Sequence, residues 1–198
     1  MYADRLFNAL ERNDPEPGQL LVAAPGMFSA EFARSVILLI QHDDYLTFGV
    51  NLTTRSELAV FNVLPEYLPV VAKPQALYIG GPLNQQSVVG LGMTKQGVRF
   101  EDHPQLSRLA PRLAHVDMRA DPEFLAQTLD GMRLFAGYAE WAPGQLQQEI
   151  DRGDWFVAPA LAQDVLTPGP ADLWADVMKR QPMPLPLYST FPADLDDN

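Results

Sequence analysis

Two glycine-containing turns are the segments of this chain best suited to bind a ligand through backbone groups. The first, Gly80-Gly81-Pro82, follows a predicted strand, and its glycines allow backbone amides to face a bound anion without an intervening Cβ. The second, Pro143-Gly144-Gln145, begins a predicted helix, whose free N–H groups and dipole also favour an anion. If both turns lie beside Arg34, they form a cleft for a small anionic or carboxylate-bearing ligand.

Each turn also has an ordinary structural explanation, either a tight turn that needs a positive φ or a helix start after a buried tryptophan. The aromatic residues Tyr138, Trp141 and Trp155 could likewise form a recognition surface or fill the core. The predicted ligand-binding residues are Arg34, Gly80, Gly81, Pro82, Tyr138, Trp141, Gly144 and Gln145.

A serine hydrolase is not supported by the residues that suggest one. Ser35 and His42 lie in one predicted strand, where a separation of seven residues spans about 23 Å and directs the side chains to opposite faces. The chain also lacks the Gly-x-Ser-x-Gly motif that exposes the nucleophile in many hydrolases. The enzyme alternative that stays open is hydrolytic or transfer chemistry with Glu149 or His42 as the base and helix N–H groups as the oxyanion site.

Metal and dinucleotide sites find little support. His115 has one carboxylate, Asp117, at same-face strand spacing, and two ligands do not make a metal site. The segment Gly90-Leu91-Gly92 has the wrong spacing for a dinucleotide fingerprint, and no helix is predicted after it. The sequence therefore predicts neither a metal nor a cofactor.

The composition indicates one acidic globular domain. The 198 residues are 47% hydrophobic, which is enough to build a core and excludes wholesale disorder. A formal charge of −11 disfavours direct binding to nucleic acid, because that binding depends on neutralising phosphates. There is no cysteine, and no apolar run is long enough to span a membrane. We expect a cytoplasmic monomer or weak homodimer whose partner is a protein or a small anionic ligand.

Clustered strands, rather than strands that alternate with helices, predict the fold class. We expect α+β with a mixed, largely antiparallel sheet, either strongly curved or a partial barrel, and flanking helices. The organisation expected is an N-terminal helix or arm (1–17), one domain (18–180), and a proline-rich acidic tail (181–198) that is extended or polyproline II. An exposed strand edge or this tail could also serve as a protein-interaction scaffold.

The more local expectations follow from apolar runs, glycines and prolines. Helices are predicted in segments 3–12, 121–131, 143–152 and 170–180, with an ambiguous one at 57–64. Residues 101–111 are predicted to be a loop. Strands are predicted at 19–24, 35–41, 46–53, 76–79, 87–93, 97–100, 113–118, 132–141 and 154–158.

Several separated blocks together resemble the bacterial YqgE/AlgH family. They are GQLLVAAP at 18–25, leading to FARSVI at 32–37, then YIGGP at 78–82 and GYAEWAPGQL at 137–146. The resemblance extends to the helix around Trp174 and so covers nearly the whole domain. The chain departs from the family pattern at Glu140 and Ala142, where glycines are usual, and at Gln147, where an acid is usual.

This resemblance implies a small α+β protein without a recognised DNA-binding motif. The family has no established enzymatic activity, and part of its name comes from a proposed regulator of alginate production. What the resemblance implies about function is therefore a non-enzymatic binding protein that acts indirectly in regulation.

Overall fold

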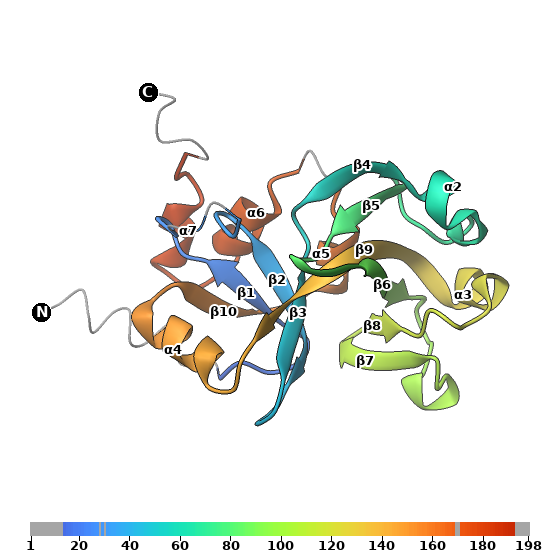
Figure 1. The fold of residues 1–198 in the computed structure, drawn as a ribbon, viewed down its shortest axis with the longest axis horizontal. Coiled ribbons are helices and arrows are strands. Elements are labelled where there is room, and N and C mark those ends of the chain that lie inside the picture. The colour runs from blue at the N-terminus through green and yellow to red at the C-terminus, as the bar shows by residue number, and fades with distance from the viewer. Residues whose placement is uncertain (1–13, 28, 30, 169–170, 193–198) are drawn as a thin grey trace, which may run out of the picture.

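The structure, a computed structural model, describes residues 14–27, 29, 31–168 and 171–192. The helix predicted over 3–12 lies outside the described residues. Within them, ten strands form one curled sheet in which β5 is parallel to β9 and the other strand pairs are antiparallel (Figure 1). The predicted α+β fold, with a mixed, largely antiparallel curved sheet and flanking helices, is confirmed.

Several of the strands follow apolar runs, whereas β4 and β7 mix polar and apolar residues. In chain order they are β1 (Gln19–Ala23), β2 (Val36–His42), β3 (Thr47–Asn51), β4 (Arg55–Ala59), β5 (Ala76–Ile79), β6 (Leu83–Thr94), β7 (Leu106–Ala110), β8 (Leu113–Val116), β9 (Leu129–Trp141) and β10 (Trp155–Pro159).

The helices are short and connect or cover these strands. They are α2 (Val60–Val63), α3 (Pro122–Thr128), α4 (Gln145–Arg152), α5 (Ala162–Leu166), α6 (Leu173–Lys179) and α7 (Leu185–Tyr188), with 3-10 turns η1 (Pro65–Tyr67) and η2 (Phe100–Asp102).

Strand β9 joins the two halves of the sheet. Its last residues pair with β3, which continues through β2 and β1 to β10. Its first residues pair with β6, which continues through β8 to β7. Figure 1 shows β9 crossing the middle of the molecule between these halves. A side chain at the end of β9 therefore lies where the two halves meet.

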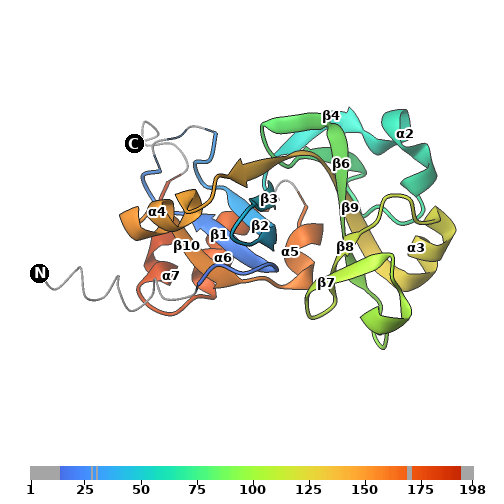
Figure 2. The ribbon, with the colours of Figure 1, turned by 60° about the horizontal axis from the view of Figure 1, so that its bottom comes forward.

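Strand β2 is buried on both faces, as its unbroken apolar sequence predicts. Val36 and Leu38 belong to the core that contains Trp174 of α6, whereas Ile37 and Leu39 belong to the core that α4 covers. Alternate side chains of a strand point to opposite faces, so each set needs its own covering helix. In Figure 2, α4 and α7 lie on opposite sides of β10.

Helix α3 begins as its sequence predicts. The side chain of Asp121 accepts a hydrogen bond from the backbone N–H of Glu123 at 2.9 Å, and Pro122 occupies the first turn. The helix ends at Thr128, before Gly131, because β9 starts directly at Leu129. Pairing with β6 extends the strand backward over residues that the sequence assigns to the helix.

Three other expectations are wrong. Residues 97–100 do not form a strand, because the region after β6 turns into η2 and β6 pairs with β8 and β9 instead. Residues 106–110, predicted to be loop, form β7 on the edge of the sheet beside β8. The proline-rich tail is not polyproline II where it is described. It contains α7, whose Leu185 is buried and whose Tyr188 stacks on Phe156.

Among the described residues, no helix has the length and apolar character needed to cross a bilayer.

Candidate functional site

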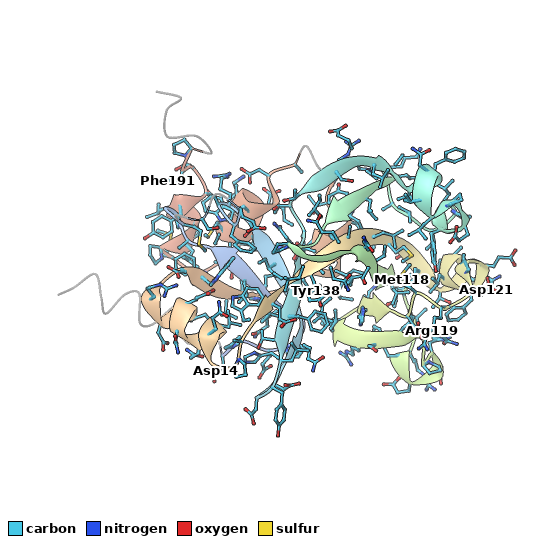
Figure 3. The ribbon with its side chains drawn as sticks, in the orientation of Figure 1. Asp14, Met118, Arg119, Asp121, Tyr138 and Phe191 are labelled. Carbon is cyan, nitrogen blue, oxygen red and sulfur yellow. The ribbon has the colours of Figure 1, made fainter. Side chains whose placement is uncertain are left out.

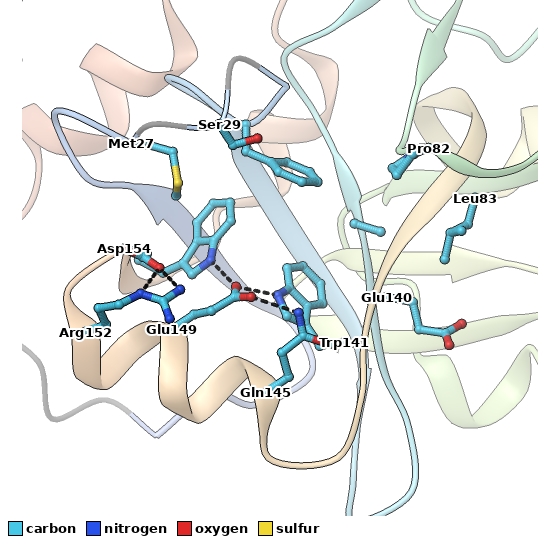
Figure 4. A pocket seen from close by; sticks show the side chains of 13 residues that line it. Met27, Ser29, Pro82, Leu83, Glu140, Trp141, Gln145, Glu149, Arg152 and Asp154 are labelled. Atoms are coloured by element: carbon cyan, nitrogen blue, oxygen red, sulfur yellow. Dashed lines mark hydrogen bonds and ion pairs between the residues drawn. The ribbon is translucent and has the colours of Figure 1, made fainter.

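A hydrogen-bonded cluster of two tryptophans and one glutamate forms where β9, α4 and β10 meet. Trp141 ends β9, Glu149 lies in α4, and Trp155 begins β10. The Oε2 atom of Glu149 accepts hydrogen bonds from Nε1 of Trp141 at 2.8 Å and from Nε1 of Trp155 at 2.9 Å (Figure 4). Two indole donors therefore converge on a single carboxylate oxygen.

Gln145 holds the other oxygen of this carboxylate. It lies one helical turn before Glu149, and its Nε2 donates to Oε1 of Glu149 at 2.9 Å. Its own Oε1 accepts from the backbone N–H of Ala142 at 3.0 Å, so the amide also ties the start of α4 to the end of β9. Three donors fix the orientation of the Glu149 carboxylate.

A cavity of about 550 Å³ opens beside this cluster. Its wall combines apolar and aromatic side chains with a few charged ones, the usual make-up of a small-molecule site. The two halves of the sheet both contribute, because the turn into β6 faces the start of α4 across the end of β9 (Figure 4). The lining residues are Met27, Ser29, Phe32, Pro82, Leu83, Ala139, Glu140, Trp141, Gln145, Glu149, Arg152, Asp154 and Trp155.

Among the described lining residues one guanidinium is present, that of Arg152, and it forms an ion pair with Asp154. Nε of Arg152 donates to Oδ2 of Asp154 at 2.8 Å, and its terminal nitrogen contacts the same oxygen. The hydrogen bond to the Asp154 side chain raises the pKa of Arg152 above its ordinary value. The charge of Glu149 also raises the pKa of Arg152. The described lining residues nevertheless carry three carboxylates, those of Glu140, Glu149 and Asp154, against one guanidinium, so the cavity is negative.

Of the residues that the sequence proposes for ligand binding, Pro82, Trp141 and Gln145 line this cavity. Gly80 and Gly81 are close in sequence to Pro82 but pack against β9. A Cβ on Gly80 would lie 2.3 Å from the carbonyl oxygen of Gly137, and a Cβ on Gly81 would lie 2.2 Å from the carbonyl carbon of Tyr138.

The backbone amide of Gly80 is also occupied, because it donates to the carbonyl of Ala136 at 2.8 Å. These two glycines therefore allow two backbone segments to approach closely. That role explains their presence without a bound anion.

Gly144 lies just before α4 with a left-handed φ of +76° and lines a different cavity, of about 410 Å³. His42 and Thr47 line that same cavity, and Nδ1 of His42 lies 2.7 Å from Oγ1 of Thr47. The two bases considered for an enzyme, His42 and Glu149, thus open onto separate cavities.

Arg34 lines a third, smaller cavity at the C-terminal segment. Its guanidinium pairs with Asp172, donates to the backbone carbonyl of Phe191 at 2.8 Å, and lies 4.2 Å from the ring centroid of Trp174. Tyr138 packs edge to face against Phe48, with 5.7 Å between the ring centroids. Figure 3 shows Tyr138 near the middle of the molecule and Phe191 at its outer end.

The structure therefore distributes the eight proposed residues over three cavities and the packed junction with β9. It does not bring Arg34 to the glycine turns. The lining residues that sequence reasoning did not select include Phe32, Leu83 and Arg152. One signal was available, because Gln145 and Glu149 share a helix face at i, i+4 spacing directly after Trp141.

His115 and Asp117 do not act as a ligand pair. Asp117 instead accepts two hydrogen bonds from the Arg119 side chain, at 3.0 and 2.9 Å. In the part of the chain that is described, no group of three or more histidine, aspartate or glutamate side chains is placed to hold a metal ion.

Comparison with known proteins gives one consistent result. The profile of the AlgH-like family matches residues 20–186. The UPF0301 protein of Corynebacterium efficiens is 66% identical over 197 residues, which are 100% of this chain and 98% of that protein. The UPF0301 protein of Mycobacterium tuberculosis is 45% identical over 181 residues, which are 91% of this chain and 90% of that protein.

Two solved structures are similar. The crystal structure of a Corynebacterium diphtheriae protein matches with a TM-score of 0.91 and 68% identity, over 96% of this chain and 100% of that one. The solution structure of AlgH from Pseudomonas aeruginosa matches with a TM-score of 0.64 and 22% identity, over 91% of this chain and 97% of that one, and so shares the fold. The predicted resemblance is confirmed, and the chain belongs to the AlgH-like family.

Proposed function

We propose that this protein is a non-enzymatic binding protein that takes a small ligand, or a side chain of a protein partner, in the cavity beside Trp141, Glu149 and Trp155. The observation that carries this proposal is the Glu149 carboxylate, which two indoles fix at the wall of the cavity. A volume of about 550 Å³ lies within the range of small-molecule sites.

Binding has more support than catalysis because of how Glu149 is held. A general base must accept a proton from the substrate, and three of the roughly four acceptor positions of this carboxylate are already taken by Trp141, Trp155 and Gln145. His42, the other base considered, opens onto a separate cavity. The two candidate bases therefore do not share a cavity, and an enzyme would have to use one of them alone.

An anionic ligand, the expectation from the sequence, also has less support at this cavity. That expectation depends on Arg34, which is engaged with Asp172 and Trp174 elsewhere. The guanidinium that does line the cavity, Arg152, is paired with Asp154. An anion would meet three carboxylates, those of Glu140, Glu149 and Asp154, against one guanidinium among the described lining residues.

The regulatory part of the proposal follows from the family resemblance and from charge. A chain of formal charge −11 is unsuited to contact phosphate backbones, which favours indirect regulation through a ligand or a protein. A cytoplasmic monomer or weak homodimer is the form in which we propose that it acts.

The test is to block the cavity without disturbing the core. Leu83 is exposed at the rim, so Leu83→Trp fills the entrance, whereas Leu187→Trp adds the same side chain on the exposed face of α7, outside this cavity. We expect 2-phenylethanol and related fragments to shift backbone amide NMR signals around Trp141 and Trp155 in the unmodified protein and in Leu187→Trp. Leu83→Trp should lose these shifts. Equal shifts in all three proteins, or none at the cavity, would contradict the proposal.

A further inference from the structure

The Glu149 carboxylate retains one acceptor position. An ionised carboxylate offers about four lone-pair positions. In the described structure, two on Oε2 are taken by the indoles of Trp141 and Trp155, and one on Oε1 is taken by Gln145. Glu149 is half-buried and lines the cavity, so the remaining position on Oε1 can receive a donor from a ligand.

The charge of the lining favours a cationic donor. The cavity wall carries three carboxylates, those of Glu140, Glu149 and Asp154, and the single guanidinium of Arg152. With three negative groups and one positive group among the described lining residues, the local potential is negative. A ligand ammonium or guanidinium would lower this potential, whereas a carboxylate would raise it.

The aromatic residues of the wall also favour a positively charged ligand. The rings of Phe32 and Trp155 lie 5.9 Å apart at 68°, and those of Trp141 and Trp155 lie 6.2 Å apart at 82°. Both indole N–H edges, the positive parts of these rings, are directed at Glu149. Because Trp141 and Trp155 are almost fully buried, the half-buried Phe32 is the aromatic residue of the wall with more surface left for a ligand, and the π face of an aromatic ring attracts organic cations.

We infer that the group bound in this cavity is an organic cation, an apolar body that carries one ammonium or guanidinium. This inference rests on the function proposed above. The apolar body packs among Met27, Phe32 and Leu83, and the cationic head donates to the open position of Glu149. Glu140 at the rim adds attraction during entry.

Three probes of similar size, one cationic, one neutral and one anionic, test the inference on the full chain. They are phenethylammonium, 2-phenylethanol and 3-phenylpropionate, titrated while tryptophan fluorescence and amide NMR shifts are recorded. We expect phenethylammonium to bind about tenfold more tightly than the alcohol, which corresponds to 1.4 kcal/mol, and the carboxylate to bind most weakly. If the alcohol or the carboxylate binds as tightly as the cation, the inference is wrong while the proposed function stands. If none of the three binds in the cavity, both are wrong.

A matched pair of variants locates the effect. Glu149→Gln keeps the shape of the side chain but removes its charge, so we expect it to lose the tenfold preference and retain the alcohol. Glu123→Gln changes an exposed residue of α3 that does not line this cavity, and it should leave all three affinities unchanged. Unaltered cation binding by Glu149→Gln would overturn the inference.

Salt dependence provides a second readout, and it is measured on the unmodified protein, so it does not depend on whether a variant folds. Added NaCl should weaken binding of phenethylammonium but not of the alcohol, because salt screens the attraction between charges. A short peptide that carries a free lysine side chain and an acetylated N-terminus, added to the same titration, distinguishes the source of the cation. Competition at comparable concentration indicates a partner's side chain, and its absence indicates a free small molecule.

Discussion

Trp141 and Trp155 pack edge to face, with ring centroids 6.2 Å apart and planes at 82°, and both donate to the same oxygen of Glu149. They lie at the two ends of the connection that contains α4. The shared carboxylate therefore ties the helix to the end of β9 and the start of β10 at once. Both tryptophans are almost fully buried, at 4% and 2% exposure, so their N–H groups have little access to water.

Removal of the Glu149 side chain should destabilise the fold. Glu149→Ala leaves two buried indole donors without their acceptor, and we expect the free energy of unfolding to fall by about 2 kcal/mol. Glu149→Gln keeps an acceptor oxygen and should cost less than half of that. Urea denaturation followed by circular dichroism gives these values. Gln147→Ala, an exposed position of the same helix, serves as the control, and a loss no larger for Glu149→Ala than for this control contradicts the prediction.

Arg34 should stabilise the docking of the C-terminal segment. Its guanidinium joins Asp172, the carbonyl of Phe191 and the ring of Trp174, so Arg34→Ala removes an ion pair, a hydrogen bond and a cation–π contact. We expect a loss of about 1–2 kcal/mol. Hydrogen exchange should also become faster in α6 and α7.

Arg119→Ala provides the comparison for Arg34. Its ion pair with Asp117 is exposed, with the Arg119 side chain at 91%, so water screens the attraction and Arg119→Ala should leave the free energy of unfolding almost unchanged. Unchanged exchange in α6 and α7 of Arg34→Ala would show that the segment is held by apolar packing alone.

Arg133, in the middle of β9, is the largest buried side chain that carries a charge in the described structure. Its Nε donates to the carbonyl of Val165 at 2.9 Å and a terminal nitrogen donates to that of Leu166 at 3.0 Å, and these are end carbonyls of α5. Its guanidinium carbon lies 4.3 Å from the ring centroid of Tyr78. Arg133 thus supplies hydrogen-bond donors to the last two carbonyls of α5.

Arg133→Met should therefore cost about 3 kcal/mol of unfolding free energy, because hydrogen bonds from a charged donor contribute about 1.5–3 kcal/mol each. Arg133→Lys should recover only part of this, since an ammonium lacks the planar fork. Arg108→Met, on the exposed edge strand β7, should stay within about 0.5 kcal/mol. Chemical denaturation of the three variants measures these changes in unfolding free energy. A loss for Arg133→Met no larger than that for Arg108→Met would contradict the role of Arg133 at the end of α5.

His115 should make the protein less stable at mildly acidic pH. Burial lowers the pKa of His115 below its ordinary value of 6.5, and the charge of Asp117 opposes this shift only in part. The unfolded chain therefore binds the proton more readily than the folded one. The stability that comes from the neutral ring is present above pH 6.5 and is lost as the pH falls through the lower folded pKa.

NMR titration of the His115 ring should show a pKa below 6.5, and Asp117→Asn should lower it further. In denaturation experiments between pH 7.5 and 5.5, His115→Gln should show a smaller loss of stability than the unmodified protein. A measured pKa of His115 at or above 6.5 would contradict both expectations.

The sequence determined those parts of the fold that depend on local patterns. The uninterrupted apolar run of β2 predicts burial on both faces, and Asp121 followed by Pro122 predicts the start of α3, because these signals are contained within a few neighbouring residues. The blocks around Gly80-Gly81-Pro82 and Trp141 were sufficient to indicate the family.

Pairing between distant segments was decided only by the tertiary structure. Edge strand β7 carries little apolar signal and exists because β8 offers its hydrogen-bonding edge, and β9 starts earlier than its sequence suggests because β6 pairs with it. Such pairing depends on neighbours far along the chain, so no local pattern reveals it.

The candidate site also depends partly on residue type, which the sequence shows, and partly on the packing of distant segments, which it does not. Trp141, Gln145 and Pro82 could be selected from residue type, and all three line the cavity. Residue type gave no information on where Arg34 points, because its partners Asp172 and Trp174 are brought to it by the packing of α6 on β1 and β2. The convergence of two indoles on Glu149 likewise needs β9, α4 and β10 in place, since a hydrogen bond is specified by positions in space and the sequence specifies only order along the chain.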